Sequence, residues 1–296
     1  MAQHTFGGNW TEIKLARLAK YLMAYRTIFA KNERARHFKT WYVDAFAGTG
    51  SRSVPDVASK SADLFADVYE DAETKEYLDG SAQIALGLSS PFDHYLFIEK
   101  SKSRVETLRT TIETDHAKLF PRCDFRHGDA NDVLKTWCGE RDWRKERAVV
   151  FLDPYGMQVE WTTVQALAAT KAIDLWYLFP LGVGVARLLK RDGNIEESWQ
   201  NRLDLLFGTS DWRSRFYGIQ TKRDLFGDHE TVERTAPVEK IREFVNERLA
   251  GCFARVAEGL VLRNSKSSPL YLLCFAAANE RGAPTALRIA QDILDE

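Results

Sequence analysis

Paired cysteines, membrane-length apolar runs and an excess of one charge are all missing from this sequence. The four cysteines stand far apart, at Cys123, Cys138, Cys252 and Cys274. They form no C-x-x-C pair, which argues against a disulfide framework and against a zinc site. No apolar stretch approaches the length of a membrane span, and the first residues show no charged start followed by an apolar run. We therefore expect a soluble cytoplasmic protein with reduced thiols and no metal site.

The charge of the chain is balanced. It has 41 Lys and Arg residues against 42 Asp and Glu residues, for a formal net charge of -1 at pH 7. A surface that binds a polyanion must therefore be a local patch rather than a property of the whole molecule. With 296 residues the chain is long enough for one elaborated α/β domain, and we expect a single domain over residues 1–296.

The most specific stretch is Thr40-Trp-Tyr-Val-Asp-Ala-Phe-Ala-Gly-Thr-Gly50. Its first part is a near-continuous apolar run, typical of a parallel strand that is covered on both faces. Gly48 and Gly50 then predict a turn under which a nucleotide-like ligand lies, because glycine tolerates positive φ and lets the backbone approach a ligand closely. An ordinary glycine turn, with Asp44 as a satisfied buried acid, is the simpler alternative.

The order of this motif separates it from the dinucleotide fingerprint, which needs a third glycine on the following helix and an acid about 20 residues further on. Here the acid, Asp44, stands before the glycines. Asp44-x-Phe46-x-Gly48-x-Gly50 resembles the first motif of class I S-adenosylmethionine-dependent methyltransferases. The Phe-Ala-Gly-Thr-Gly wording resembles the enzymes that methylate exocyclic amino groups of nucleobases. The resemblance implies S-adenosylmethionine as the cofactor, with the turn under its methionine and ribose parts.

Four predicted strands end on an acid, and these acids are Asp44, Glu99, Asp129 and Asp153. Because the carboxyl ends of parallel strands meet at one edge of a sheet, we expect the four carboxylates along the same edge. Glu99 has the two oxygens needed to accept hydrogen bonds from both ribose hydroxyls. The alternative for Glu99 is an acid that favours the N-terminus of the following helix.

The methyltransferase resemblance implies a set of cofactor-binding residues. In that family an acid at the position of Asp129 accepts the adenine amino group, and the backbone amides that follow, from Ala130 on, contact the ring. The full set is Asp44, Phe46, Ala47, Gly48, Gly50, Glu99, Lys100, Asp129, Ala130 and Lys14. Lys14 belongs to a predicted helix before the sheet, on a face that is most simply solvated, and it reaches either the cofactor carboxylate or only the solvent.

The fourth strand runs directly into Pro154-Tyr155-Gly156. The usual amino-methyltransferase tetrapeptide is Asp/Asn-Pro-Pro-aromatic, and Asp-Pro-Tyr-Gly is instead similar to the Asp-Pro-Phe-Gly of tRNA guanosine dimethyltransferases. An exocyclic amine is a poor nucleophile because its lone pair is delocalised into the ring, so an enzyme must hold acceptors against its hydrogens. Asp153, Pro154 and Tyr155 provide a carboxylate, a fixed carbonyl and a ring, and are the candidate catalytic residues. A strand stopped by a Pro-Gly turn is the simpler alternative.

Several segments lie outside the five parallel strands. Residues 1–39 are predicted to be an N-terminal helical extension, and the acidic residues 54–79 a loop or lid over the cofactor. Residues 181–235 are predicted to be a helical insertion, whose basic and aromatic residues either bind nucleic acid or form an amphipathic packing surface. Residues 253–262 and 270–277 then form an antiparallel pair, because the loop between them is short.

Five parallel strands and a C-terminal antiparallel pair are the sheet plan of class I methyltransferases, so the expected fold is a Rossmann-like α/β domain of that type. Over most of its length the chain also resembles the three-Cys-motif partner protein family. This resemblance is carried by Trp10, Lys14, Leu15, Tyr21, Leu22, Tyr25, Asp44–Gly50, Phe97–Glu99, Gly128–Asp129, Phe151–Gly156 and Ser268–Leu273. The name of the family implies association with a radical-type partner protein that bears a three-cysteine motif.

The function predicted from these features is that of an S-adenosylmethionine-dependent N-methyltransferase acting on an exocyclic amino nitrogen of a nucleobase in RNA or DNA. The absence of a Pro-Cys dipeptide on the fourth strand argues against carbon methylation through a cysteine adduct. Two alternatives stay open. One is a methyltransferase for a small molecule or for a product of the partner protein, and the other is a non-catalytic cofactor-binding adaptor for a three-Cys-motif partner.

Overall fold

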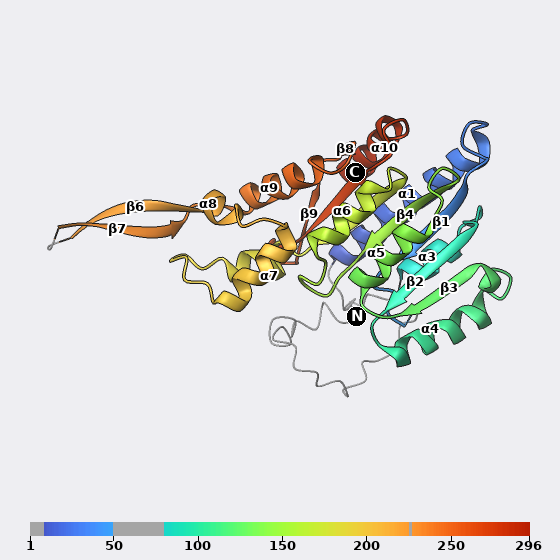
Figure 1. Cartoon of the computed structure of the whole chain (residues 1–296), viewed down its shortest axis with the longest axis horizontal. Coiled ribbons are helices and arrows are strands. Elements are labelled where there is room, and N and C mark those ends of the chain that lie inside the picture. Colours follow the sequence, from blue (N-terminus) through green and yellow to red (C-terminus); the bar gives the residue numbers. More distant parts are fainter. Residues whose placement is uncertain (1–8, 50–79, 225–226) are drawn as a thin grey trace, which may run out of the picture.

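The computed structural model describes residues 9–49, 80–224 and 227–296 (Figure 1). Its helices are α1 (Asn9–Lys31), α3 (Ser81–Leu86), α4 (Lys102–Asp115), α5 (Ala130–Glu140), α6 (Trp161–Ala169), α7 (Glu197–Phe207), α8 (Trp212–Phe216), α9 (Val238–Ala250) and α10 (Ala283–Asp295), with a short 3-10 turn η2 (Phe120–Arg122) and a π-helix η3 (Leu181–Ala186). Its strands are β1 (Lys39–Asp44), β2 (His94–Glu99), β3 (Cys123–His127), β4 (Glu146–Leu152), β5 (Ile173–Phe179), β6 (Tyr217–Asp224), β7 (Gly227–Arg234), β8 (Arg255–Val256), β9 (Leu260–Arg263) and β10 (Pro269–Ala277). Gly50 and the predicted acidic loop at 54–79 lie outside the described residues.

The central sheet has the strand order β3-β2-β1-β4-β5-β10-β8, with β9 also paired to β10. Strands β1 to β5 run parallel, and β10 runs antiparallel to β5. This order confirms the predicted sheet of five parallel strands with an antiparallel end. One detail differs, because the strand predicted over 253–262 is broken into β8 and β9. Within the break, a Cβ on Gly259 would lie only 2.8 Å from Leu272 Cδ1.

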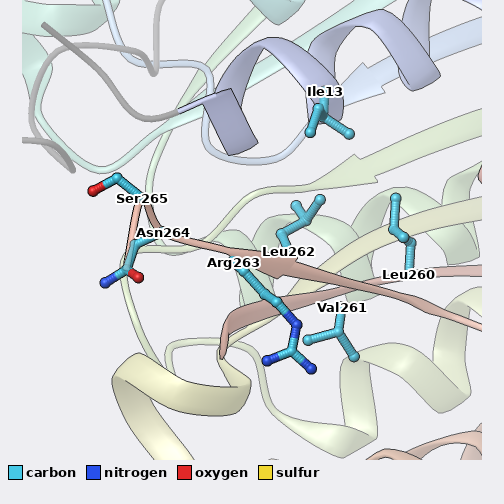
Figure 2. A pocket seen from close by; sticks show the side chains of 7 residues that line it. All are labelled: Ile13, Leu260, Val261, Leu262, Arg263, Asn264 and Ser265. Atoms are coloured by element: carbon cyan, nitrogen blue, oxygen red, sulfur yellow. The ribbon is translucent and has the colours of Figure 1, made fainter. Parts of the chain in front are cut away.

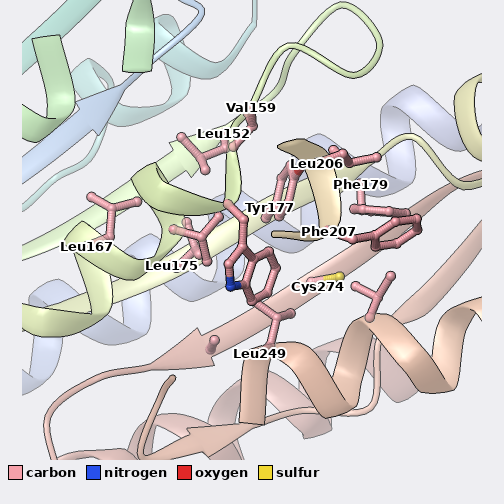
Figure 3. Close-up of a cluster of buried hydrophobic side chains, with 14 of the residues drawn as sticks. Leu152, Val159, Leu167, Leu175, Tyr177, Phe179, Leu206, Phe207, Leu249 and Cys274 are labelled. Carbon is pink, nitrogen blue, oxygen red and sulfur yellow. The ribbon is translucent and has the colours of Figure 1, made fainter. Parts of the chain in front are cut away.

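Side chains of the central sheet alternate between two buried faces. The face that carries Val43 packs against α5, α6, α7 and α9. The face that carries Tyr42 packs against α1, α3, α4 and α10. Figure 3 shows part of the first face, where Tyr177 of β5 lies with Phe207 of α7 and Leu249 of α9. Cover on both faces explains why the strand sequences are near-continuous apolar runs rather than alternating ones.

Helix α1 lies within the predicted N-terminal helical extension, over Asn9–Lys31, and crosses the second face from one end of the sheet to the other. Its polar contacts with the strands or their ends are Lys14 with Asp153, Tyr21 with Asp174, and Arg26 with Thr40. From Lys14 to Arg26 the helix rises about 18 Å, close to the length of a strand of five or six residues. The same helix therefore supplies polar partners at both ends of the parallel strands.

The segment 181–235 is only partly helical, which corrects the prediction of a helical insertion. The helices η3, α7 and α8 occupy its first part, and β6 and β7 then form an antiparallel hairpin. Figure 1 shows this hairpin projecting from the body of the molecule beyond α8. In α8 the rings of Trp212 and Phe216 are buried, so they pack in the core and are not available to stack on a base.

Candidate functional site

The four strand-end acids lie at the carboxyl edge of the sheet, because β3, β2, β1 and β4 are neighbours and run parallel. Asp44 and Glu99 are the last residues of β1 and β2, and Asp153 follows the last residue of β4. Asp129 comes two residues after β3 and caps helix α5. The structure thus brings together the acids that the sequence placed at successive strand ends.

Asp44 is fully buried and held by hydrogen bonds. Its carboxylate accepts from Ser81 Oγ at 2.5 Å, from the Phe46 backbone N–H at 3.3 Å and, more weakly, from the Tyr42 hydroxyl at 3.4 Å. Burial raises the pKa of Asp44 from 3.8 to about 6, the Ser81 hydroxyl opposes this rise, and the charge of Asp153 adds to it. Asp44 therefore keeps its proton to a higher pH than an exposed aspartate does.

Glu99 joins the glycine turn to the second strand. Its Oε2 accepts from the Gly48 backbone N–H at 3.2 Å, and its Oε1 accepts from the Ser101 backbone N–H at 2.9 Å. Gly48 has φ of 60°, a conformation that favours glycine. The contact with Ser101 at the start of α4 agrees with the helix N-terminus interpretation, and the contact with Gly48 agrees with a place at the ligand turn. Hydrogen bonding of Glu99 to ribose hydroxyls stays a prediction.

Asp129 serves as the N-cap of α5. Its Oδ1 accepts from the backbone N–H of Asn131 at 2.9 Å, and its Oδ2 lies 3.8 Å from Nζ of the exposed Lys100. The side chain of Asp129 stays 43% exposed, so Oδ2 remains accessible for a ligand. Asn131 in turn accepts from Thr163 Oγ1 of α6 at 2.8 Å, and in this way it ties α5 to α6. Ala130, the first residue of α5, is buried beside them.

The most informative contact at this edge is an ion pair between Lys14 and Asp153. Lys14 Nζ lies 2.6 Å from Asp153 Oδ2, and the two side chains are 2% and 6% exposed. The placement of Lys14 on a solvated face is therefore wrong. Its spacing contained the signal, since Lys14 stands four residues after Trp10 and four before Leu18, both of which are buried. Contact with a cofactor carboxylate stays a prediction for Lys14.

The first turn of α1 holds further buried polar atoms. Trp10 Nε1 and Thr11 Oγ1 are buried and have no hydrogen-bond partner in the part of the chain that the structure describes. The Trp10 ring lies 5.4 Å from Lys14 Nζ and 4.9 Å from the ring of Tyr271 on β10. Buried polar atoms without a partner also occur elsewhere in the described residues, Tyr25 Oη and Trp176 Nε1 among them, and the two in this turn are candidates for hydrogen bonds to a ligand.

The turn after Asp153 has the form that the sequence predicted. Pro154 is buried, Tyr155 is partly exposed, and Gly156 adopts φ of 72°. A fixed proline followed by a left-handed glycine holds the backbone between them in one conformation. The edge of the sheet thus presents a carboxylate, a rigid turn and an accessible tyrosine in consecutive positions.

A cleft of about 310 Å³ lies between α1 and β9 (Figure 2). Because β10 begins beside the end of β5, the turn from β9 into β10 is at the carboxyl edge as well. Ile13 borders the cleft from α1, Leu260 and Leu262 point toward it from β9, and Arg263 points away. Ile13, which borders this cleft, directly precedes Lys14 in the chain.

Within residues 9–49, 80–224 and 227–296, no group of three or more His, Cys, Asp or Glu side chains is placed to hold a metal ion, and no helix is long and apolar enough to cross a membrane. The four cysteines are free, and burial raises the pKa of Cys123 and Cys138 to about 12. These two thiols stay protonated near neutral pH and are poor nucleophiles.

Comparison with known proteins finds similarity only among solved structures. No protein-family model matches the chain, and no curated protein matches it. An S-adenosylmethionine-dependent methyltransferase from Clostridium acetobutylicum aligns with a TM-score of 0.39 and 10% identity over 88% of this chain and 91% of that chain. An O-methyltransferase from Bacillus cereus in complex with SAH aligns with a TM-score of 0.33 and 15% identity over 72% of this chain and 78% of that chain. TM-scores this low carry no argument about the reaction, which has to come from the residues of this chain.

Proposed function

We propose that this protein is an S-adenosylmethionine-dependent methyltransferase that methylates an exocyclic amino nitrogen of a nucleobase in RNA or DNA. The observation that carries the proposal is the carboxyl edge itself, where a buried Asp153 is followed by Pro154 and Tyr155, beside three further acids at the ends of β1, β2 and β3. An edge rich in hydrogen-bond acceptors suits a donor-rich, positively charged cofactor and an amino-group substrate.

The residues at the edge fit S-adenosylmethionine in their chemistry. Its two ribose hydroxyls and its adenine amino group are donors, and Glu99 and Asp129 are acceptors at neighbouring strand ends. The Glu99 carboxylate is already fixed by two backbone N–H groups, and one oxygen of Asp129 is accessible. The cofactor would supply an electrophilic methyl group on a sulfonium centre.

The residues after β4 would orient the nucleophile. Asp153 and the Pro154 carbonyl would accept the two hydrogens of the amino group, which directs the nitrogen lone pair toward the methyl carbon. The methyl carbon would then bond to the nitrogen as its bond to sulfur breaks, with that electron pair left on sulfur. The nitrogen would then lose one proton, which Asp153 would accept. The ring of Tyr155 would pack against the base.

The test is transfer of labelled methyl from S-adenosylmethionine to separated pools of tRNA, rRNA, DNA, protein and small metabolites. Wild type is compared with Asp153→Ala and with Asp174→Asn, which changes a partly buried acid at the opposite end of the sheet. The proposal expects label in one nucleic-acid pool, lost in Asp153→Ala and kept in Asp174→Asn. Label in the small-metabolite pool would support a small-molecule substrate instead.

A protein partner is a second element of the proposal. The resemblance to three-Cys-motif partner proteins suggests that a radical-type protein provides or modifies the substrate. If no pool is labelled although the cofactor binds, the assay is repeated with extract from the cell of origin. Transfer only in its presence favours a partner-dependent enzyme, and no transfer under either condition favours a non-catalytic adaptor.

A further inference from the structure

The ion pair between Lys14 and Asp153 changes the chemistry that Asp153 offers to a substrate. Asp153 Oδ2 lies 2.6 Å from Lys14 Nζ, and neither side chain is accessible to more than a few per cent. Water therefore screens the pair poorly, and the two charges compensate each other. What remains of the carboxylate for a substrate is a single oxygen, Oδ1, on a pair with no net charge.

A buried carboxylate without a cation and one with a cation select different amines. A buried carboxylate without a cation favours a positively charged ammonium group, because the charge of the ammonium group compensates for the hydration that the carboxylate lost on burial. The second has its cation already, and a further positive charge would be repelled by Lys14. A neutral amino group needs only a hydrogen-bond acceptor, which Oδ1 provides.

We propose that Lys14 is a positioning and selectivity residue that fixes Oδ2 of Asp153 and leaves Oδ1 for a neutral amino group, so that the site accepts the weakly basic amino group of a nucleobase and rejects alkylammonium groups. The inference rests on the proposed function, because it takes Asp153 as the group that faces the substrate. It deepens that function by excluding aliphatic amines as methyl acceptors.

The unpartnered polar atoms of the same helical turn also favour a nucleobase as the substrate. Trp10 Nε1 and Thr11 Oγ1 are buried without a partner among the described residues, and these residues precede Lys14 by four and three positions. Residues at this spacing share one face of a helix. The amino group of a nucleobase stands beside a ring nitrogen that accepts hydrogen bonds, whereas an alkylammonium group carries no such acceptor. Two spare donors therefore complement a base better than an aliphatic amine.

Two further ionisable groups face this pair from β1. Asp44 and Tyr42 both interact electrostatically with Asp153, and the charge of Lys14 also acts on Asp44. Without Lys14, two carboxylates of adjacent strands would face each other with no cation between them. Two acids that share a site hold their protons more tightly, so methyl transfer by a Lys14 variant would need a higher pH.

The experiment compares Lys14→Met, which removes the charge, with Lys14→Arg, which keeps it. Lys20→Met is the matched control, because Lys20 lies on the same helix with its side chain 45% exposed and pairs with Glu296 at the surface. The first readout needs no turnover: putrescine is titrated calorimetrically into each protein in the presence of S-adenosylhomocysteine. We expect Lys14→Met to bind putrescine at least tenfold more tightly than wild type. Lys14→Arg and Lys20→Met should bind putrescine as wild type does. In the double variant Lys14→Met with Asp153→Asn, the gain in putrescine affinity should be lost.

The second readout is the pH dependence of methyl transfer to the labelled pool. The acid limb in Lys14→Met is expected to move up by one pH unit or more, and that of Lys20→Met to stay in place. Equal putrescine affinity and an equal acid limb in a folded Lys14→Met protein would overturn the inference. If Lys14→Met does not fold, Lys14→Gln takes its place with the same expected outcomes. If wild type methylates nothing, the proposed function fails, and the putrescine titration still reports whether Lys14 governs amine selectivity.

Discussion

The two ends of the central sheet contain similar buried groups that are used in different ways. Each end has an acid whose pKa is raised from 3.8 to about 6 by burial, the fully buried Asp44 at the carboxyl end and the partly buried Asp174 at the amino end. Helix α1 supplies a polar partner at both ends, Lys14 at one and Tyr21 at the other. The difference lies in what surrounds each acid.

At the amino end, the polar groups of the protein form hydrogen bonds with one another. Arg26 donates to Thr40 Oγ1 and to the Ser90 carbonyl, and Asp93 accepts from the backbone N–H of Thr40. These contacts link α1, β1 and the chain before β2, and they leave little polar capacity for a ligand. They are typical of a structural role.

At the carboxyl end, charge is concentrated and incompletely paired. Lys14 pairs with Asp153, its charge also acts on Asp44, and Glu99 and Asp129 follow at the next two strand ends. Helices α4, α5 and α6 begin after these strands, so their N-termini favour negative charge at this edge. The comparison teaches that one fold holds acids at both ends, and that those at the carboxyl edge lie where helix N-termini favour negative charge.

The largest expected difference between the ends is in Asp44→Asn against Asp174→Asn. A raised pKa in the folded state means that the unfolded chain loses its proton first, so stability falls as pH rises from about 4 to about 6. For Asp44 this amounts to about 3 kcal/mol above pH 6. Asn does not ionise, so Asp44→Asn should become more stable than wild type by about that amount at pH 7.5 and by little at pH 3.5, as measured by urea unfolding at each pH.

Asp174→Asn provides the control at the other end of the sheet. Its side chain keeps some solvent access, so we expect a smaller gain, about half as large. Binding of S-adenosylhomocysteine should weaken at least tenfold in Asp44→Asn, because the carboxylate that orders the Phe46 backbone is lost, and should be unchanged in Asp174→Asn. Equal cofactor affinity in the two variants would remove Asp44 from the site.

A smaller effect is expected from Arg26→Met at the amino end. The change removes the hydrogen bonds to Thr40 and Ser90, at 2.5 Å and 3.2 Å, and the stacking of the guanidinium 5.2 Å from the Phe92 ring. A loss of about 2 kcal/mol in the free energy of unfolding follows from these contacts. Methyl transfer per folded molecule should not change, since no contact reaches the carboxyl edge. A drop in turnover at unchanged stability would contradict the division between the two ends.

These contrasts also explain which parts of the molecule were predictable. The strands and their terminal acids could be predicted from the sequence, because apolar runs buried on both faces give a strong local signal. Lys14 was misplaced, because a basic residue on an amphipathic helix is normally exposed, and only the partner at Asp153, far away in the chain, keeps it buried. The hairpin of β6 and β7 was missed, and Ile219 on it is 68% exposed, so this apolar residue does not carry the burial signal that identifies a strand in sequence.

The smallest expected effects come from the tyrosines that donate to the two acids. The Tyr21 hydroxyl lies 2.7 Å from Asp174, whereas the Tyr42 hydroxyl lies 3.4 Å from Asp44, which Ser81 already serves at 2.5 Å. Tyr21→Phe should therefore cost about 1.5 kcal/mol at pH 8, and Tyr42→Phe about 0.5 kcal/mol or less.

The two costs should also differ in their pH dependence. The Tyr21 hydroxyl favours the ionised form of Asp174, so its removal raises the pKa of Asp174 further. The destabilisation by Tyr21→Phe should then grow as pH rises through about 6, because the folded protein must give up a proton that the unfolded chain has already lost. Urea unfolding of both variants at pH 4.5 and pH 8 measures this. If Tyr21→Phe lowers the free energy of unfolding by the same amount at both pH values, Asp174 does not ionise in this range. Asp44 and Asp174 would then not be equivalent.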